Sequence, residues 1–312
     1  MPANLTPDYL AAERAYKAAE TQQEKVAALE EMLATLPKHK GTEKLQADIK
    51  HRLSQARRES QKKGAGHSAP AYLVKREGAG QIALVGPPNA GKSRLVCALT
   101  HARPEVADYP YTTRMPVPGM MTFEDVQIQL VDLPPVGREF RESWMPQALR
   151  TLQTSALVVD VNDPDVLGEI EFTRAQLDSW RVPQPRLLVG NKLDLSSEEN
   201  FDALRELCGE GLACVGVSAV DGTGLDVFRA AAFRALDVVR FYSKPPGKPA
   251  DLAVPYTLQR GETVQDAAAK VHRDFAEHLK YARLFRKSHD HDGLMVERTH
   301  LVEDQDILEF HV

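Results

Sequence analysis

A glycine-bounded loop between an apolar run and a helix-like run holds the residues of this sequence best suited to chemistry. The loop spans residues 86–93 and reads Gly-Pro-Pro-Asn-Ala-Gly-Lys-Ser, after the apolar run 81–85. In such a loop successive backbone N–H groups point inward around a phosphate, and the following helix N-terminus favours an anion. Lys92 would reach the β- and γ-phosphates, and the Ser93 hydroxyl would bind Mg²⁺. A plain glycine turn with a solvated lysine is the alternative, which the spacing and both flanks disfavour.

Two further positions could complete a magnesium site. Asp132 ends the apolar run 128–131, and an acid at a strand end can hold Mg²⁺ directly or through water, although plain turn acids occur there too. Thr112 and Thr113 lie in a loop-like region. A threonine there could join the Mg²⁺ shell once a γ-phosphate is present, so one nucleotide state would order a loop that the other releases.

A third set of residues could recognise the base. These polar residues follow the apolar run 187–189 and are Asn191, Lys192 and Asp194. The Asp194 carboxylate can accept two hydrogen bonds, from N1–H and the exocyclic amine of guanine. Adenine offers no such pair of donors, so the discrimination should be strong. The pair Ser218-Ala219 follows the strand-like run 213–217, and its backbone N–H could meet the guanine O6.

The segments that must position these residues alternate between strand-like and helix-like from about residue 72 to residue 242. This alternation is typical of an α/β fold with a doubly wound, mostly parallel sheet covered by helices. Its expected buried strands include the apolar runs 128–131, 156–159 and 187–189. Ligands of such sheets bind at the carboxyl ends of the strands, where all of the residues above lie.

Residues 1–63 are predicted to be a helical region whose two apolar stripes, joined by a Pro/Gly turn, form an antiparallel helical hairpin. Within it, the stretch 38–63 carries nine cations against three acids; the cations are Lys38, Lys40, Lys44, Lys50, Arg52, Arg57, Arg58, Lys62 and Lys63. The exposed face could pair with an RNA backbone, and a merely solvated helix face is the alternative. Residues 64–78 are predicted to be a linker.

A proline-rich stretch separates a final domain from the central one. We take residues 244–251 as the linker and 252–312 as the domain. It begins as a strand, a turn and a helix capped by Thr263, and further strands are expected at 294–296 and 306–312.

Cations cluster along this helix and its sequel, with Tyr281 and Phe285 between them. The cations are Lys270, Arg273, Lys280, Arg283, Arg286 and Lys287. Cations with aromatic rings can bind looped RNA, and the alternative is a solvated face above aromatics in the core. Nearby histidines lack a set of metal ligands and are expected at the surface or in local hydrogen bonds; they are His272, His278, His289 and His291.

Length, composition and charge limit the classes of protein to which this chain can belong. The 312 residues, 43% hydrophobic and 27% charged, suit about two domains and an extension. We expect a cytoplasmic protein without a membrane segment, because no apolar run approaches the roughly 20 residues needed to span a bilayer and no leader is evident. The net charge of −5 argues against a uniformly basic nucleic-acid binder.

The motifs of residues 79–243 resemble the translation-factor class of P-loop GTPases and, within it, the Obg/DRG family. The marks are 86–93, 108–113, 132–134, 191–194 and 218–219. The resemblance implies a G domain that binds GTP or GDP with Mg²⁺ on Ser93, Thr113 and Asp132, with Lys92 and Thr113 catalytic. It also implies K⁺ on Asn89, as in the K⁺-stimulated members. The implied nucleotide-binding residues are Gly86, Pro87, Pro88, Asn89, Ala90, Gly91, Lys92, Ser93, Asp132, Asn191, Lys192, Asp194, Ser218, Ala219 and Val220.

The final domain resembles the TGS domain, a small β-grasp fold that recurs in threonyl-tRNA synthetases, (p)ppGpp synthetase/hydrolases and DRG-type GTPases. The marks are 261–266, 274–275, 280–283 and 301–307.

In the G domain, the chain departs from the Obg/DRG family at one place. The family pattern D-x-P-G reads here Asp132-Leu133-Pro134-Pro135, so the N–H that normally bonds the γ-phosphate is missing.

The position after the missing glycine also differs from many signalling GTPases, because Val136 stands where they carry a water-orienting glutamine. We therefore expect a slow GTP-hydrolysing switch, completed by K⁺, the ribosome or another partner, that contacts ribosomal or structured RNA through residues 38–63 and the TGS domain. The alternative is a nucleotide-bound module that binds RNA or ribosomes with little hydrolysis. A P-loop kinase would leave residues 191–194 unexplained.

Overall fold

The computed structural model divides the chain into two compact units, Met1–Ala71 and Tyr72–Val312. It describes residues 7–19, 22–36, 42, 45–54, 70, 72–100, 115–138, 142–196, 198–208, 212–286 and 293–312. Thr113, Lys287, two of the four histidines named above and most of the cations between residues 38 and 63 lie outside these ranges.

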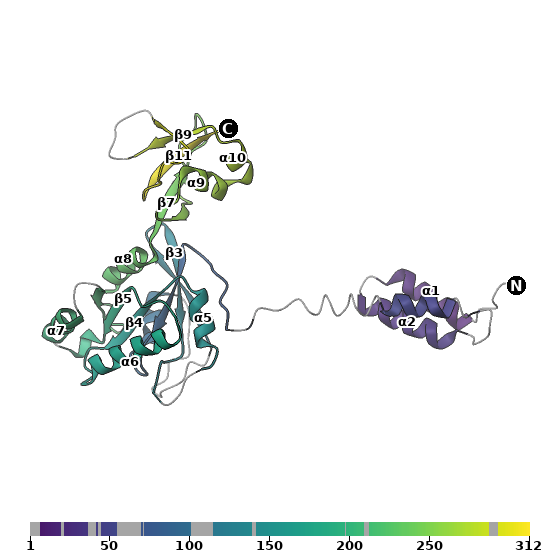
Figure 1. Ribbon diagram of the computed structural model, residues 1–312, viewed down its shortest axis with the longest axis horizontal. Helices are drawn as coiled ribbons and strands as arrows, with labels where there is room; N and C mark the ends of the chain where they lie inside the picture. Colours follow the sequence, from purple (N-terminus) through teal and green to yellow (C-terminus); the bar gives the residue numbers. More distant parts are fainter. Residues whose placement is uncertain are drawn as a thin grey trace. The chain divides into compact units, whose positions relative to one another are not determined.

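In its described part, the N-terminal unit consists of α1 (Pro7–Ala18), α2 (Gln22–Thr35) and the helical residues 45–54 (Figure 1). All three segments contribute to one apolar core, which is made of Tyr9, Ala12, Leu29, Met32, Leu36, Ile49 and Leu53. The predicted helices are therefore present. The first helix adds to the core expected of the hairpin, because Tyr9 and Ala12 recur at helical spacing on one buried face.

A six-stranded sheet forms the centre of the second unit, in the order β2-β3-β1-β4-β5-β6. The strands are β1 (Gly80–Val85), β2 (Val117–Phe123), β3 (Val126–Asp132), β4 (Thr154–Asp160), β5 (Leu187–Asn191) and β6 (Ala213–Gly216). Only the β2–β3 pair is antiparallel, so the predicted mostly parallel sheet is confirmed. Parallel pairing aligns the carboxyl ends of β1, β3, β4, β5 and β6 at one edge, as shown by the register Leu84↔Asp132 and Asp160↔Asn191.

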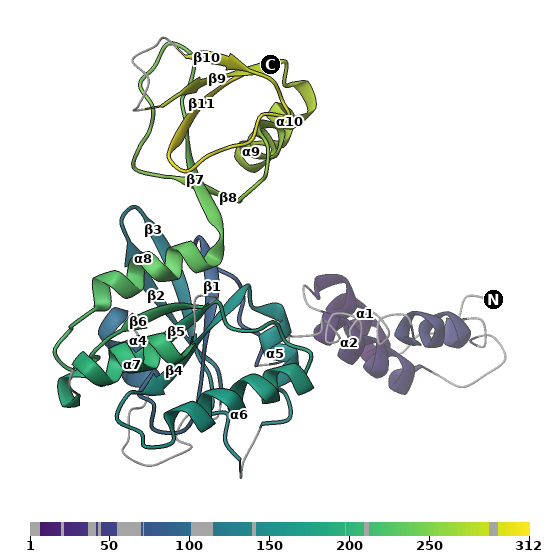
Figure 2. The same ribbon diagram turned by 60° about the vertical axis from the view of Figure 1, so that its left-hand side comes forward.

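Helices cover both faces of this sheet (Figure 2). They are α4 (Lys92–Leu99), α5 (Met145–Thr151), α6 (Val166–Ser179), α7 (Glu198–Cys208) and α8 (Leu225–Leu236), with a 3₁₀ turn at Leu193–Leu195. Alternate residues of a strand face opposite sides. Ile82 and Leu84 therefore pack in the core with α4 and α8, whereas Ala83 and Val85 pack in the core with α5 and α6.

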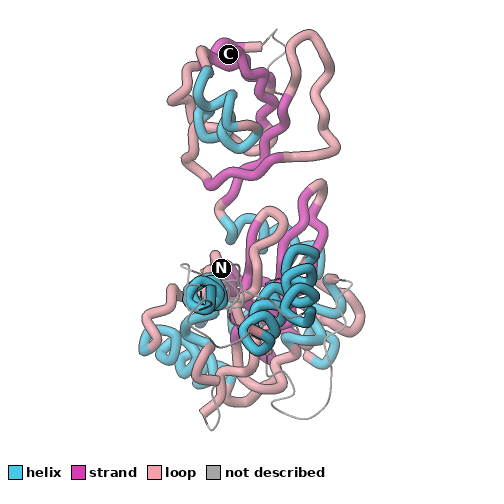
Figure 3. Tube along the Cα trace, turned by 90° about the vertical axis from the view of Figure 1, so that its right-hand side faces the viewer, coloured by secondary structure: helices cyan, strands magenta, loops and turns pink. Residues whose placement is uncertain are grey.

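The C-terminal part of the unit is a five-stranded sheet in the order β10-β9-β11-β7-β8. Its elements are β7 (Val238–Ser243), β8 (Tyr256–Gln259), α9 (Val264–Val271), α10 (Arg273–His278), β9 (Tyr281–Phe285), β10 (Leu294–Val296) and β11 (Asp306–His311). Figure 3 shows the two helices in cyan beside the magenta strands. Thr263 caps α9 as predicted, in a capping box with Asp266. The expected β-grasp fold is present.

The predicted domain boundary at residues 244–251 is wrong by one strand. β7, which we placed at the end of the central domain, pairs with β8 and β11 of the second sheet. Asp237, with φ of +55°, is the only residue between α8 and β7. The sequence signal was misleading because the proline-rich stretch lies within the second domain, between its first two strands.

In the described parts of the chain, no helix is long and apolar enough to cross a bilayer.

Candidate nucleotide-binding site

The loop of residues 86–93, the phosphate loop, connects the end of β1 to the first turn of α4. Its backbone has positive φ at Gly86 (146°), Asn89 (61°) and Gly91 (86°). A Cβ at Gly86 would lie 2.1 Å from the carbonyl oxygen of Val158, and a Cβ at Gly91 would lie 2.3 Å from Asn191 Nδ2. The loop therefore needs glycine at both ends, because it passes directly against β4 and β5.

Lys92 lies along the phosphate loop and is buried. Its ammonium donates hydrogen bonds to the carbonyl oxygens of Gly86 at 3.0 Å and Pro87 at 2.8 Å. Burial lowers the pKa of the Lys92 ammonium to about 8, and attraction to Asp132 opposes this shift. A cation fixed at this point, shielded from water, is suited to bind phosphate oxygens.

A hydroxyl and a carboxylate meet beside the phosphate loop. Ser93 Oγ, in the first turn of α4, donates to Asp132 Oδ2 at 2.5 Å, and Asp132 at the end of β3 is fully buried. Oxygen ligands of this kind are those that Mg²⁺ prefers, so the pair fits the ion expected with a bound nucleotide. Thr113, the third predicted ligand, lies outside the described residues.

The predicted base-binding residues come together at the ends of β5 and β6. Asn191 Nδ2 donates to the Ala90 carbonyl at 2.9 Å, and Asn191 Oδ1 accepts from the Ala219 N–H at 3.3 Å. Ser218 Oγ donates to Asp194 Oδ1 at 2.7 Å. Asn191 thereby joins the phosphate loop to the loop that begins at Ser218, while the Asp194 carboxylate is oriented at an exposed edge.

Sequence reasoning missed the residues that hold Lys192. Lys192 Nζ lies 2.7 Å from Asp160 Oδ2 at the end of β4, and Asn162 Nδ2 donates to the Lys192 carbonyl at 3.2 Å. Burial acts to raise the pKa of Asp160, but the hydrogen bonds from Lys192 and Asn162 lower it overall. The signal was available, because Asp160 follows a buried strand in the same way as Asp132.

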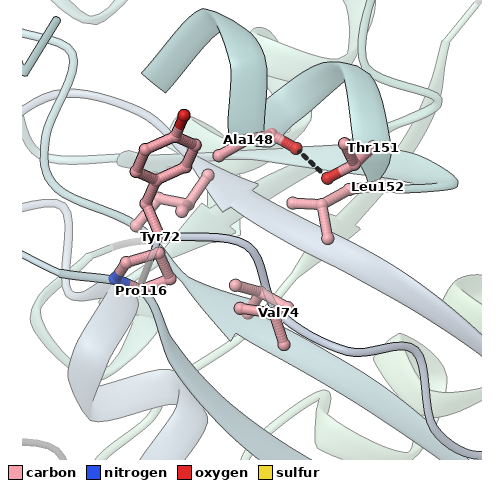
Figure 4. Close-up of a pocket in the computed structure, with 8 residues that line it drawn as sticks. Tyr72, Val74, Pro116, Ala148, Thr151 and Leu152 are labelled. Carbon is pink, nitrogen blue, oxygen red and sulfur yellow. Dashed lines mark hydrogen bonds between the residues drawn. The ribbon is translucent and has the colours of Figure 1, made fainter. Parts of the chain in front are cut away.

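An apolar hollow lies beside α5 rather than at the phosphate loop (Figure 4). Tyr72 borders it, stacks on Trp144 with ring centroids 5.6 Å apart, and donates from its hydroxyl to Gln147 Oε1 at 2.6 Å. The lining residues are Tyr72, Val74, Pro116, Val131, Leu133, Ala148, Thr151 and Leu152. The Thr151 hydroxyl is bonded to the Ala148 carbonyl at 2.7 Å. None of these lining residues is charged, and none is among the candidate nucleotide-binding residues.

Two family models match the chain. One, described as a 50S ribosome-binding GTPase, matches residues 81–192, and the TGS domain model matches residues 239–312. The fold and the site thus define a P-loop GTPase that carries a C-terminal TGS domain. Within this class the chain belongs to the Obg/DRG family.

Relatives match over nearly the whole chain. An uncharacterized GTP-binding protein of Methanocaldococcus jannaschii is 28% identical, with 92% of this chain and 92% of that protein covered. Ribosome-interacting GTPase 1 of Saccharomyces cerevisiae is 25% identical (92% and 98% covered), and developmentally-regulated GTP-binding protein 1 of Xenopus laevis is 25% identical (91% and 97% covered). These alignments, of 358 to 367 residues, are longer than the 312-residue chain, so the relatives contain segments that it lacks.

Proposed function

We propose that this GTPase holds Mg²⁺ and GTP between the phosphate loop, Asp132 and Asp194 and works as a switch on ribosomes or structured RNA in the cytoplasm. The observation that carries the proposal is the position of Asn191. Its side chain is hydrogen-bonded to Ala90 in the phosphate loop and to Ala219, next to Ser218, which in turn bonds to Asp194, the residue proposed to bind the base. A single side chain therefore sets the distance between a phosphate site and a purine site.

The chemistry follows from the residues at each end. Lys92 would neutralise the β- and γ-phosphate oxygens, Ser93 and Asp132 would hold Mg²⁺, and Thr113 would complete the shell in the GTP state. Mg²⁺ supplies charge neutralisation on the phosphates when bound. K⁺ would bind near Asn89, whose exposed side chain lies at the outer turn of the phosphate loop.

Calorimetry tests the nucleotide site. GDP and GTP should each bind in magnesium buffer, ATP should not, and chelation of magnesium with EDTA should weaken GTP binding. Absence of heat with both guanine nucleotides would remove the basis of the proposal.

A second function, a nucleotide-bound module with little hydrolysis, is favoured by the segment after Asp132. Pro135 has no N–H, and the side chain of Val136 is fully buried, so neither can orient water. Single-turnover hydrolysis with and without ribosomes separates the two functions. A switch should show a burst stimulated by ribosomes or K⁺, whereas a module of the second kind shows none.

The TGS sheet offers a candidate RNA surface. Tyr281, Arg283 and Phe285 alternate on β9 with Ala282 and Leu284, which face the core. Arg283 is exposed, so the aromatic side chains next to it lie on the face of the sheet that is away from the core. Stacking rings beside a cation suit unpaired bases.

The basic surface of this domain is smaller than the sequence suggested. Arg286 pairs with Asp306 at 2.6 Å and Arg273 pairs with Glu277 at 2.8 Å. In the N-terminal unit, Arg52, one of the two described cations of the stretch 38–63, pairs with Asp48 at 2.9 Å. We therefore assign an RNA contact in the TGS domain to Arg283, which is exposed between Tyr281 and Phe285.

Sedimentation with ribosomes tests the partner. One yeast relative is named a ribosome-interacting GTPase, which supports the choice. Binding should fall steeply as salt rises and should weaken further in Arg283→Glu, whereas Arg273→Glu, at an exposed position already paired with an acid, should have a smaller effect. Binding that is insensitive to both salt and Arg283 would exclude this surface.

A further inference from the structure

The segment that follows Asp132, the proposed Mg²⁺ ligand, is hydrogen-bonded to the phosphate loop. The Val136 N–H donates to the Gly86 carbonyl oxygen at 3.0 Å, and Lys92 Nζ donates to the same oxygen at 3.0 Å. A carbonyl oxygen has two lone pairs, so both of its acceptor positions are engaged. The Val136 N–H is thus committed within the protein and faces the first residue of the phosphate loop.

Side chains hold the same segment on its other side. Leu133 and Val136 are fully buried, in one core with Met145 and Leu149 of α5. This packing and the hydrogen bond from the Val136 N–H to the Gly86 carbonyl fix both ends of the stretch 133–136.

Arg138, two residues after this stretch, is anchored as well. The Arg138 guanidinium lies 4.9 Å from the ring centroid of Phe172 and 3.3 Å from Glu169 Oε1, both on α6. The chain therefore leaves the phosphate loop in a direction set by α6.

Within the fixed stretch, residues 134–136 have no N–H to offer an anion. Pro134 and Pro135 carry none, and the N–H of Val136 is used by Gly86. Its proline rings also restrict φ, so the backbone has little freedom to turn another group inward. At residues 134–136, a terminal phosphate near Asp132 and Lys92 would therefore meet backbone that cannot donate a hydrogen bond.

We propose that residues 133–136 form a rigid segment, the fixed wall, whose conformation is the same with GTP and with GDP. Pro135 is the reason, because without an N–H it cannot bind the terminal phosphate that distinguishes the two nucleotides. The inference rests on the proposed function that the site binds guanine nucleotides. The preference for GTP over GDP then comes from Lys92, Mg²⁺ and the groups that reach the γ-phosphate from elsewhere, and this segment keeps one position in both states.

Hydrogen–deuterium exchange on the full chain tests the fixed wall. Peptides that cover residues 86–92 report nucleotide binding, and peptides that cover 133–138 report the wall. We expect the first to gain protection with GDP and with a non-hydrolysable GTP analogue, and the second to show equal protection with the two nucleotides. Unequal protection of 133–138 overturns the proposal, whereas no gain at 86–92 removes the proposed function instead.

Pro135→Ala tests the role of the missing donor, because it restores an N–H at this position. We expect it to bind the GTP analogue about tenfold more tightly while GDP affinity is unchanged, as for one added hydrogen bond to a charged oxygen. Pro134→Ala is the matched control, because it likewise adds an N–H and loosens the same stretch but one residue away from the missing donor, so its ratio of affinities should stay as in the parent. An unchanged ratio in Pro135→Ala, with GDP binding and thermal unfolding retained, overturns the assignment.

Discussion

Arg240 of β7 and Asp125 in the β2–β3 turn lie 115 residues apart in the chain, and their side chains form an ion pair with Nη1 2.7 Å from Oδ1. The same guanidinium donates to Asp304 at 2.8 and 3.1 Å and lies 4.8 Å from the ring centroid of Phe233. Glu124 is a further acceptor. The Arg240 side chain is only 4% exposed. This residue therefore joins the hairpin of the first sheet to the loop that precedes β11.

Arg240→Leu should destabilise the protein by about 2 kcal/mol, because it leaves carboxylates without their shared cation. The figure lies below that of a fully buried pair, because the partner acids remain partly hydrated. Urea unfolding measures it. Arg260→Leu is the control, since the pair of Arg260 with Asp237 is exposed, and its loss should cost less than about 1 kcal/mol. Equal effects of the two variants would contradict a central role for Arg240.

Acid should weaken the same junction. Burial acts to raise the pKa of Asp125, but hydrogen bonds from Tyr242 and Arg240 hold it below its ordinary 3.8. The ionised carboxylate therefore stabilises the fold above that ordinary value, and the contribution is lost as the pH falls through the lowered pKa. Asp125→Asn should flatten the decline of unfolding free energy below pH 3.8. Asp202→Asn, at an exposed pair on α7, should leave the decline unchanged.

The same hydrogen bond should delay ionisation of its donor. Burial, followed by the contact with Asp125, raises the pKa of Tyr242 to about 12. Ultraviolet titration should therefore show a tyrosine that ionises well above the usual range and that returns toward it in Asp125→Asn. A titration curve unchanged by that substitution would show that the contact is absent in solution.

Asp194→Asn should exchange guanine specificity for xanthine specificity. An amide in this position presents a donor to the exocyclic amine of guanine, whereas the oxygen of xanthine accepts from it. We expect the affinity for GTP to fall at least about 100-fold and the affinity for XTP to rise. Ser218→Ala removes the hydroxyl that orients Asp194 and should cause a smaller loss. GTP affinity that survives in Asp194→Asn would dismiss this carboxylate as the base reader.

Turnover should be faster in KCl than in NaCl at equal ionic strength if Asn89 binds K⁺. Asn89→Gly is the best test, because glycine keeps the left-handed backbone at φ 61° and removes only the amide side chain. We expect the variant to turn over at one rate in both salts and to retain GDP affinity. Equal rates already in the parent protein would refute the assignment.

The candidate site was largely predictable because its polar residues follow short apolar runs, and parallel strands bring those run ends together. Ser93 was named from the spacing of its motif and Asp132 from its place at the end of an apolar run, and the two lie in direct contact. The bridge from Asn191 to Ala90 was not predictable, because it depends on the depth at which the phosphate loop passes β5.

The boundary between the two sheets was harder to predict for a physical reason. β7 is mostly apolar and follows α8 after one residue, so its sequence alone suits a strand of either sheet. Its partners are decided by register with β11, where Asp306 lies opposite Phe241, and by the ion pair of Arg240 with Asp304. Both depend on residues more than 60 positions later, which local patterns do not contain.

The loop at Ser218, α8 and β7 form one nearly unbroken stretch, with Asp237 alone between the helix and the strand. A Cβ at Gly224, where α8 begins, would lie 2.0 Å from the Gly216 carbonyl oxygen, so the near end of the stretch is tightly seated against β6. A connection with so few residues outside the helix and the strand is rigid, so it transmits a displacement of one end to the other. A displacement of the C-terminal domain would therefore move the loop at Ser218, whose hydroxyl is bonded to Asp194.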